Sequence, residues 1–364
     1  MKVVIDAIPV VPFGGYAVAF EGLLRGWDQL GTGDELHALL AEDVELDVPA
    51  SVHVHRVRIG KPEVLRRIAV QSRAARALCR SVDADVLLGM LPTTAVIPVG
   101  APKVITVYDL RHELVPEQFS RGRRLLRRLS YGVGYRQAQG VICISERTRS
   151  DLLRSRPWLS SKPVVAVHFG ADHVDGWPRN GSPPDGAPYA LAFGHFPNKA
   201  VDRVIDAMEI LHKRGEARPL VFVGVPGSER AGVAERIRDA GLDHVVSLLP
   251  WLEDEAFRSR FASAGLIVFP SDFEGFGLPA VEAMRLGTPL VISTDKALLE
   301  VTGGNATVAD AKDPASLADA ISAAWKTPAE ELERARAYAA RYSWEKTARE
   351  TRDVLATVAL SAAG

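Results

Sequence analysis

The stretch 269–284 reads FPSDFEGFGLPAVEAM. An apolar run ends at its first residue, Gly275 and Gly277 follow, and Pro279 stands where a helix would begin. Glycine allows the chain to turn sharply, and proline suits the first turn of a helix because its missing N–H has no intrahelical partner there. The stretch therefore predicts a strand, a glycine turn and a helix over 278–286. The first backbone N–H groups of such a helix favour phosphate or sugar oxygens.

Two glutamates flank this turn. Glu274 precedes the glycines, and Glu282 lies about one turn into the expected helix among apolar neighbours. An unpaired carboxylate is costly to bury, so Glu282 needs a partner, and a pair of sugar hydroxyls would supply one. A base such as Arg285 would also do so. An ordinary strand, turn and helix with one exposed acid and one paired acid therefore stays open.

The same alternation of short β-branched runs and longer helical stretches continues in both directions. Strands are expected at 3–8, 53–57, 86–88, 104–107, 141–144, 164–167, 189–193, 220–223, 245–248, 266–269 and 290–292. Helices are expected at 15–30, 62–82, 120–138, 145–156, 201–214, 229–240, 254–264 and 278–286, and in the tail beyond Ser316. Apolar strands separated by helices indicate parallel sheets covered on both faces. The expected fold class is α/β, with two doubly wound domains that face each other across a cleft.

Domain boundaries follow from composition. Glycine and proline fill eight of the nineteen positions from 170 to 188, which is typical of a linker. We expect a first domain over 1–170, a linker over 171–188 and a second domain over 189–342. A C-terminal helix over 343–364 is expected to pack back toward the first domain. The net charge is +6 up to residue 170 and −7 beyond it, which suggests different partners for the two halves.

The composition excludes several classes of protein. The chain has 364 residues, 47% hydrophobic and 24% charged, and a net charge of −1, as is typical of a globular protein of about two domains. The two cysteines, Cys79 and Cys143, form neither a disulfide framework nor a metal-binding spacing, which suits a reducing cytosol. Disulfide-rich mini-proteins, membrane-spanning proteins and collagens are excluded, and we expect a cytoplasmic location. No G-x-G-x-x-G follows the first strand, which argues against a dinucleotide-dependent dehydrogenase.

The glycine turn and its surroundings resemble the retaining glycosyltransferases of family 4, which have the GT-B fold of two Rossmann-like domains. Glu274 and Glu282, with seven residues between them, match the paired acids of that family, and 270–271 and 287–291 agree as well. The resemblance implies that Glu274 lies near the donor sugar and that Glu282 holds the nucleotide ribose. It also implies that amides of the turn hold sugar hydroxyls and phosphate, namely those of Gly275, Phe276, Gly277 and Leu278.

Three further positions resemble the family's donor site. Lys199 matches a lysine that binds the donor diphosphate, a role for which a charged hydrogen-bond donor is suited. The family's neighbouring arginine is replaced by His195, with the spacing one residue short. A protonated His195 would substitute for it, and a capping or packed neutral histidine is the alternative. Gly15 lies in a glycine pair after the first strand, a loop that similar enzymes bring up to the donor phosphates.

The expected strand 104–107 resembles the family's strand that ends over the active site. The family's usual histidine is replaced by Tyr108, Asp109 is retained, and His112 follows three residues on. The resemblance implies that Asp109 positions the acceptor or acts as a base, with His112 as a second candidate. Without the family, the simpler interpretation is that Asp109 caps a turn.

The expected helix 120–136 is rich in arginine and carries a leucine stripe. Such a helix can lie on an anionic membrane, or it can be an outer helix whose leucines pack on the sheet. The stripe is too narrow to serve both purposes, and we favour packing. Peripheral contact with the inner face of a membrane is the second interpretation.

Together these features predict a retaining glycosyltransferase that moves a sugar from a nucleoside diphosphate donor to a hydroxyl acceptor. The acceptor would be a glycan, a lipid-linked saccharide or a small metabolite, and it would bind the first domain, while the donor binds the second. The expected catalytic residues are Asp109, His112 and Glu274. We expect no metal, no cofactor and no nucleic-acid partner. A relative that binds nucleotide sugars without transferring them, and a nucleotide-sugar epimerase of the same architecture, remain alternatives.

Overall fold

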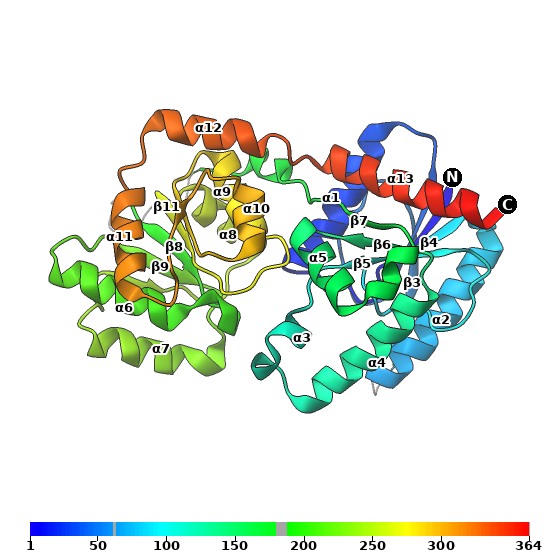
Figure 1. Cartoon of the computed structure of the whole chain (residues 1–364), viewed down its shortest axis with the longest axis horizontal. Helices are drawn as coiled ribbons and strands as arrows, with labels where there is room; N and C mark the ends of the chain where they lie inside the picture. The colour runs from blue at the N-terminus through cyan, green and yellow to red at the C-terminus, as the bar shows by residue number, and fades with distance from the viewer. Residues whose placement is uncertain (61–62, 180–187, 364) are drawn as a thin grey trace. The chain divides into compact units, whose positions relative to one another are not determined.

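The chain divides into two compact units. A computed structural model describes residues 1–60, 63–179 and 188–363. Unit 1 comprises Met1–Gly170 and Tyr342–Gly364, and unit 2 comprises Ala171–Arg341 (Figure 1). The first part of the expected linker is ordered, since it forms the short helix η3 (Asp172–Gly176), which packs on α9 of unit 2. Its remainder, 180–187, lies outside the described residues.

Unit 1 is built on a parallel sheet in the order β3-β2-β1-β4-β5-β6-β7. Its strands are β1 (Lys2–Asp6), β2 (Glu35–Ala41), β3 (His53–Val57), β4 (Val86–Gly89), β5 (Lys103–Val107), β6 (Gly140–Cys143) and β7 (Val164–Ala166). The central strands β4 and β5 are buried along their whole length. Such burial on both faces explains why they read as continuous apolar runs rather than as alternating ones.

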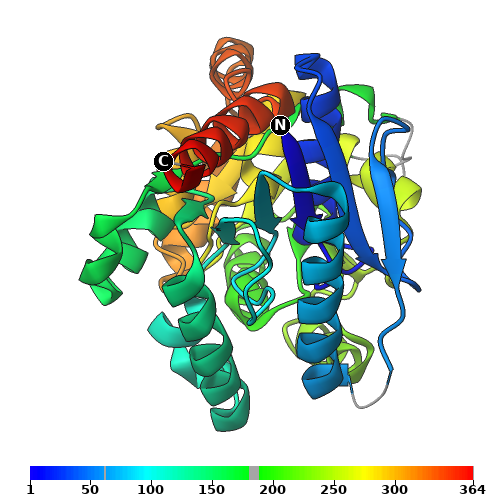
Figure 2. The same ribbon diagram turned by 90° about the vertical axis from the view of Figure 1, so that its right-hand side faces the viewer.

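Helices surround this sheet, and the last of them brings the C-terminal segment of the chain back to unit 1 (Figure 2). They are α1 (Gly15–Leu30), α2 (Glu63–Val82), α3 (Arg111–Leu114), η1 (Pro116–Gln118), α4 (Arg121–Gln137), α5 (Glu146–Ser155), η2 (Pro157–Ser161) and α13 (Trp344–Ala363). Helix α13 packs on α1, where Gly22 and Gly26 make room for it. A Cβ at Gly22 would lie 2.2 Å from the Trp344 ring. Arg352 of α13 also contacts Asp34, with its Nε 2.6 Å from Oδ2.

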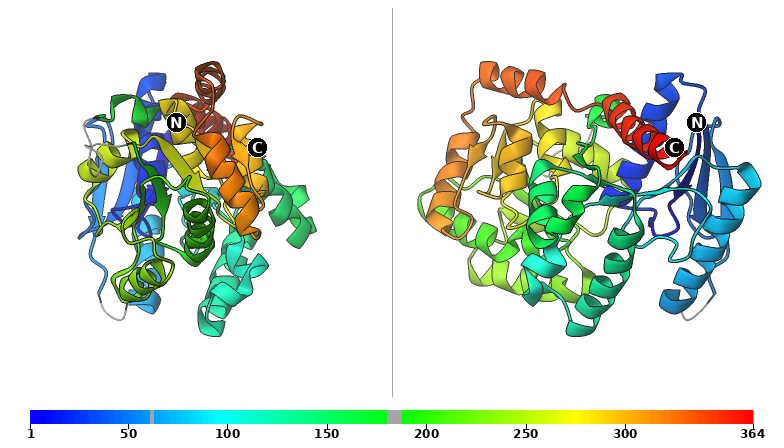
Figure 3. Two further views of the ribbon diagram at one scale, coloured as in Figure 1. Left: turned by 90° about the vertical axis from the view of Figure 1, so that its left-hand side faces the viewer. Right: turned by 45° about the vertical axis from the view of Figure 1, so that its right-hand side comes forward.

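Unit 2 has a second parallel sheet, in the order β10-β9-β8-β11-β12-β13. Its strands are β8 (Ala190–Phe193), β9 (Leu220–Val223), β10 (Val246–Leu248), β11 (Leu266–Phe269), β12 (Leu290–Ile292) and β13 (Thr307–Val308). Its further helices are η5 (Pro197–Lys199), α6 (Val201–Lys213), α7 (Gly227–Asp239), α8 (Asp254–Ala262), α9 (Leu278–Leu286), α10 (Lys296–Thr302), α11 (Pro314–Ala324) and α12 (Ala329–Ala339). Helices α6 and α11 pack together over one face of the sheet (Figure 3). The expected α/β class with two doubly wound sheets is confirmed.

The prediction for the arginine-rich helix is wrong. Leu125 and Leu129 of α4 are 59% and 62% exposed and Leu126 is 40% exposed, so the leucine stripe does not pack on the sheet. The buried face of α4 is formed by Tyr131 and Tyr135 instead. At about 100° per residue, the leucines lie on the side of the helix opposite these tyrosines. The sequence pattern is that of an amphipathic helix, but the glycine- and tyrosine-rich C-terminal half makes the contact with the domain.

Among the described residues, none of the helices combines the length and the apolar character that crossing a bilayer would require.

Candidate functional site

The glycine turn between β11 and α9 forms as the sequence predicts. Gly277 caps the N-terminus of α9 with a φ of 95°, a left-handed conformation that favours glycine. A Cβ at this position would also lie 2.4 Å from Cδ2 of Leu298. The N–H of Leu278, at the first position of α9, has no intrahelical acceptor, whereas Pro279 has no N–H and the N–H of Ala280 donates to the Gly277 carbonyl at 2.9 Å. This arrangement suits an anion or a sugar oxygen.

Lys199 lies at this turn. Its Nζ is 2.5 Å from Oε1 of Glu274 and 4.3 Å from the centroid of the Phe269 ring. The side chains of Lys199 and Glu274 are only 7% and 15% exposed. Removing one member of such a pair leaves the other charge poorly solvated and is therefore costly. The ion pair fixes a cation beside the N-terminal end of α9.

Asn198 stabilises the glycine turn through hydrogen bonds. Its buried side-chain Nδ2 donates hydrogen bonds to Ser271 Oγ at 2.8 Å, to the Phe273 carbonyl at 2.9 Å and to Glu274 Oε1 at 3.1 Å. The main-chain carbonyl of Asn198 accepts a hydrogen bond from the backbone N–H of Asp272 at 2.9 Å. One amide side chain thus ties the loop after β8 to the loop after β11.

The residue after Lys199 has an unusual backbone. Ala200 has a φ of 58°, a left-handed conformation that is rare for a residue with a Cβ and costs about 1–3 kcal/mol. The neighbouring contacts of Asn198 and Lys199 hold the chain in this conformation. Such strain is found preferentially at functional sites.

Glu282 has a protein partner. It is 5% exposed, and its Oε1 lies 3.1 Å from Nε2 of His173 in η3. Arg285, the base that the sequence offered as an alternative, pairs with Asp175 instead, at 2.6 and 2.7 Å. Two side chains of η3 therefore contact two side chains of α9.

His195 follows β8, on the same edge of the sheet as Lys199. Its ring is half-buried and lies 4.7 Å from the Phe196 ring and 6.1 Å from the Phe193 ring, centroid to centroid. Gly224 passes close behind it, since a Cβ there would lie 3.1 Å from the Cβ of His195. These ring contacts are those of a packed histidine, and its role toward a diphosphate stays a prediction.

The other predicted site residues lie in unit 1. Gly15 begins α1, and the left-handed conformation belongs to the preceding Gly14, with a φ of 74°. Asp109 follows β5, and its Oδ1 accepts a hydrogen bond from the backbone N–H of Arg111 at 2.8 Å, which is a turn cap. Tyr108 is 9% exposed and its ring lies 4.5 Å from that of Tyr16 in an edge-on arrangement.

His112 is buried in an ionic and aromatic cluster. It is 2% exposed, its Nε2 lies 3.3 Å from Glu113 Oε1, and its ring contacts that of Tyr131. Burial alone would raise the pKa of Glu113, but the His112 ring and the Arg156 guanidinium lower it to about 2. Arg156 binds both carboxylate oxygens, at 2.6 and 3.1 Å. This placement favours a structural role for His112.

The structure thus brings together some of the predicted site residues. Lys199, Glu274 and the turn 275–278 lie together in unit 2, and His195 lies on the same edge of its sheet. Sequence reasoning missed Asn198 and His173. Asn198 stands beside Lys199 in the motif and could have been found there. Nothing in the sequence connects His173 with Glu282, which is 109 residues away.

No group of three or more His, Cys, Asp or Glu side chains within the described ranges is arranged to hold a metal ion.

Two family models match the chain, one in each half. The family described as Glycosyltransferase Family 4 matches 13–174, and that described as Glycosyl transferases group 1 matches 176–342. The O-antigen chain mannosyltransferase B of Escherichia coli is 28% identical over 271 residues, or 68% of each chain. The MMP alpha-(1->4)-mannosyltransferase of Mycolicibacterium hassiacum is 32% identical over 183 residues, which are 50% of this chain but only 43% of that protein.

A solved structure extends the likeness over nearly the whole chain. HepE of Anabaena, in complex with UDP-glucose, matches with a TM-score of 0.70 and 17% identity over 98% of this chain and 100% of its own. The fold is that of a glycosyltransferase of GT-B architecture. The chain belongs to glycosyltransferase family 4, and it is therefore an enzyme that transfers sugars.

Proposed function

We propose that this glycosyltransferase takes its sugar from a nucleoside diphosphate donor bound by unit 2 and transfers it, with retention, to a hydroxyl acceptor. One observation carries the proposal: a nearly buried ammonium, Lys199, is fixed by Glu274 beside the helix start that follows Gly277. A cation beside the Leu278 amide at a helix start suits a diphosphate. HepE, a structural relative, was solved with UDP-glucose bound.

The chemistry explains why these groups matter for rate. Cleavage at the anomeric carbon proceeds through an oxocarbenium-like state while negative charge grows on the departing diphosphate. Preorganised donors aimed at that charge stabilise the transition state more than the ground state. In our proposal Lys199 and the Leu278 amide at the start of α9 are those donors, and Glu282 holds the ribose.

Glu274 is assigned to positioning near the donor sugar rather than to nucleophilic attack. Its Oε1 already accepts hydrogen bonds from Lys199 and from Asn198. A carboxylate engaged in this way is a poorer nucleophile than a free one. We therefore propose that the acceptor attacks on the face that the diphosphate leaves, assisted by the leaving phosphate, which retains the anomeric configuration.

The acceptor is assigned to unit 1. Asp109 follows the central strand β5 and is only partly buried, so its second carboxylate oxygen is available to orient a hydroxyl. His112 is not carried into the proposal because its ring is enclosed by Glu113 and Tyr131. We further propose that catalysis needs no metal, since Lys199 supplies the positive charge.

The test is an assay of diphosphate release. Purified protein is incubated with UDP-, GDP- and dTDP-linked sugars, with and without hydroxyl acceptors, and products are separated by chromatography and mass spectrometry. Acceptor-dependent release of a nucleoside diphosphate, unchanged by EDTA, supports the proposal. Binding without release would identify a non-catalytic relative. A changed sugar configuration on the nucleotide, formed without acceptor, would identify an epimerase.

We also propose that α4 lies on an anionic membrane surface. Leu125 and Leu129 project away from unit 1, and the first three turns of α4 carry five arginines and no acidic residue. At about 100° per residue, arginines flank the leucine stripe on both sides. Leucines that insert between lipids, with arginines at headgroup level, are typical of interfacial helices. This location would suit a lipid-linked acceptor.

A further inference from the structure

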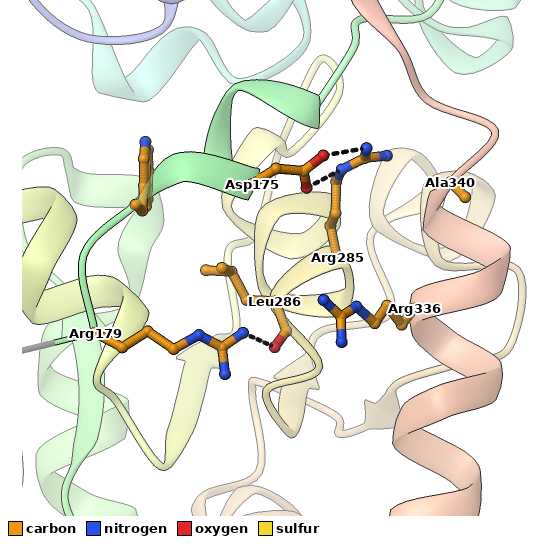
Figure 4. Close-up of a pocket in the computed structure, with 7 residues that line it drawn as sticks. Asp175, Arg179, Arg285, Leu286, Arg336 and Ala340 are labelled. Carbon is orange, nitrogen blue, oxygen red and sulfur yellow. Dashed lines mark hydrogen bonds and ion pairs between the residues drawn. The ribbon is translucent and has the colours of Figure 1, made fainter.

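Unit 2 contains a cavity at the opposite end of α9 from the glycine turn. A cavity of about 470 Å³ lies between η3 and the segment that follows it, the end of α9, and α12 (Figure 4). From Leu278 to Arg285 the helix rises about 10 Å. The cavity is therefore separate from the amides proposed to hold the diphosphate.

Three arginines and one acid line this cavity: Asp175, Arg179, Arg285 and Arg336. Asp175 binds Arg285 through two hydrogen bonds, and this contact lowers the pKa of Asp175. The carboxylate is thereby engaged by one arginine. The charges of the other two guanidinium groups have no carboxylate of their own within the cavity.

Arg179 and Arg336 approach the same space from opposite sides. Arg179 donates one hydrogen bond, from its Nη2 to the Leu286 carbonyl at 2.6 Å. In the described part of the chain, the guanidinium group of Arg336, on α12, makes no hydrogen bond and no close ion pair, and its charge acts on Asp175 from a longer distance. Figure 4 shows the two guanidinium groups pointing toward each other beside Leu286. Three arginines and one carboxylate leave an excess of positive charge in this cavity, and an anion between Arg179 and Arg336 would be attracted to both.

The geometry points to a binding site for a phosphate group, which we infer is held between Arg179 and Arg336 with Arg285 at its edge. Planar guanidinium groups bind phosphate oxygens in a forked arrangement. Trp177 also lines the cavity and offers an apolar wall to whatever carries the phosphate. The phosphate group would come either from free inorganic phosphate or from a phosphomonoester with an apolar or ring-bearing part.

Phosphate binding in this cavity would affect the proposed nucleotide site through η3 and α9. His173 and Asp175 lie two residues apart in η3, and their partners Glu282 and Arg285 lie three residues apart in α9. A phosphate that draws Arg285 from Asp175 weakens one of the two ion pairs between η3 and α9. This consequence rests on the proposed function, whereas phosphate binding itself does not.

The experiment is a calorimetric titration of the full chain with inorganic phosphate and with phenyl phosphate, at ionic strength matched with sodium chloride. Arg336→Ala should weaken binding about three- to tenfold, because charged hydrogen bonds are lost at a partly exposed site. Arg334→Ala is the matched control, since this exposed arginine lies on the same helix but does not line the cavity. Asp175→Asn should strengthen binding, because it removes the competing carboxylate.

The two ligands separate the sources of the phosphate. Tighter binding of phenyl phosphate, lost in Trp177→Ala, assigns the site to a phosphomonoester, and equal binding assigns it to free phosphate. Lys199→Ala should leave the Arg336-dependent binding intact even if no nucleotide sugar is a substrate. Equal phosphate affinity of the wild type, Arg336→Ala and Arg179→Ala, with all three folded by circular dichroism, would overturn the inference.

Discussion

Lys199 Nζ lies 2.5 Å from Glu274 Oε1, and both side chains are nearly buried. The pair joins the loop after β8 to the loop after β11 at the carboxyl edge of the sheet in unit 2, which is where doubly wound folds bind ligands. A carboxylate that fixes a cation beside a helix start makes the cation's position independent of bound ligand. This preorganisation is the basis for the predictions on activity that follow.

Lys199→Ala should lower turnover more than tenfold, since the loss of about 1.4 kcal/mol of transition-state stabilisation is a factor of ten. The measurement is steady-state release of nucleoside diphosphate from the preferred donor. Lys312→Ala, an exposed lysine of the same unit, is the control and should retain wild-type turnover. Because Glu274 loses its partner, folding of Lys199→Ala is checked by circular dichroism. A folded variant with wild-type turnover contradicts the assignment.

Glu282→Ala should weaken nucleotide binding about tenfold or more, because the buried carboxylate is the proposed partner of the ribose hydroxyls. His173→Ala should have a smaller effect on affinity, since it frees the carboxylate from one hydrogen bond while removing what orients it. Isothermal titration with the nucleoside diphosphate measures both. Unchanged affinity in Glu282→Ala would show that the pair with His173 is purely structural.

Gly277→Ala should destabilise unit 2 by about 1–3 kcal/mol, since alanine is strained at a φ of 95° and its Cβ would collide with Leu298. Gly232→Ala provides the opposite case. Gly232 lies inside α7, where a Cβ would meet no atom within 4 Å, and alanine there should stabilise by about 0.5–1 kcal/mol. Urea unfolding measures both variants. Equal effects of the two substitutions would contradict the left-handed turn.

Asp6 predicts a pH dependence of stability. Burial raises its pKa from 3.8 to about 6, although Thr94 and Gln71 donate hydrogen bonds to it. Between pH 4 and 6 the folded chain holds a proton that the unfolded chain has lost, so the free energy of unfolding falls as the pH rises. The contribution is on the order of 3 kcal/mol. Asp6→Asn should remove this dependence.

The measurement is urea unfolding at pH 4, 5, 6 and 7. Asp353→Asn, which removes an exposed carboxylate from α13, should keep the wild-type slope. Glu113 has the opposite effect on the free energy of unfolding, and at lower pH. Its pKa is lowered to about 2, so its contribution to stability is present above pH 4.5 and is lost as the pH falls toward 2. The same slope in Asp6→Asn and wild type would show that Asp6 titrates normally.

The exposed face of α4 should bind vesicles. Sedimentation with phosphatidylglycerol-containing vesicles should capture the wild type, and vesicles of phosphatidylcholine alone should capture much less, because arginines attract anionic headgroups. Leu125→Ser with Leu129→Ser should reduce capture severalfold. Leu360→Ser is the control, because this leucine is 76% exposed but lies on α13. Capture that depends on neither charge nor these leucines argues against a membrane contact.

Much of the fold could be predicted because its strands are short and apolar. The bounds of α1, β3, β9, β11, α9 and β12 agree with those expected from the sequence. Glu35–Ala41 was missed because its sequence, ELHALLA, is rich in good helix formers. Pairing with β1 on one side and β3 on the other makes it a strand. Local propensity was outweighed there by the sheet.

The sequence predicted those parts of the site that lie within one short segment of the chain. Glu274, Gly277 and Lys199 belong to compact motifs whose local geometry follows from the sequence. The partners of Glu282 and Arg285 do not, because η3 reaches α9 only through the tertiary fold. The leucines of α4 were misassigned for a related reason: an apolar stripe indicates which side of a helix is apolar, but not what covers it.

The central claim is that the turn between β11 and α9, with Lys199, holds the diphosphate of a sugar nucleotide. Thermal unfolding of wild type, Glu282→Ala and Lys199→Ala, each with UDP-, GDP- and dTDP-linked sugars, tests it most directly, since a ligand of the native state raises the melting temperature by mass action. We predict that at least one of these compounds stabilises the wild type and that both substitutions abolish most of the shift. A shift of equal size in all three proteins would contradict the account.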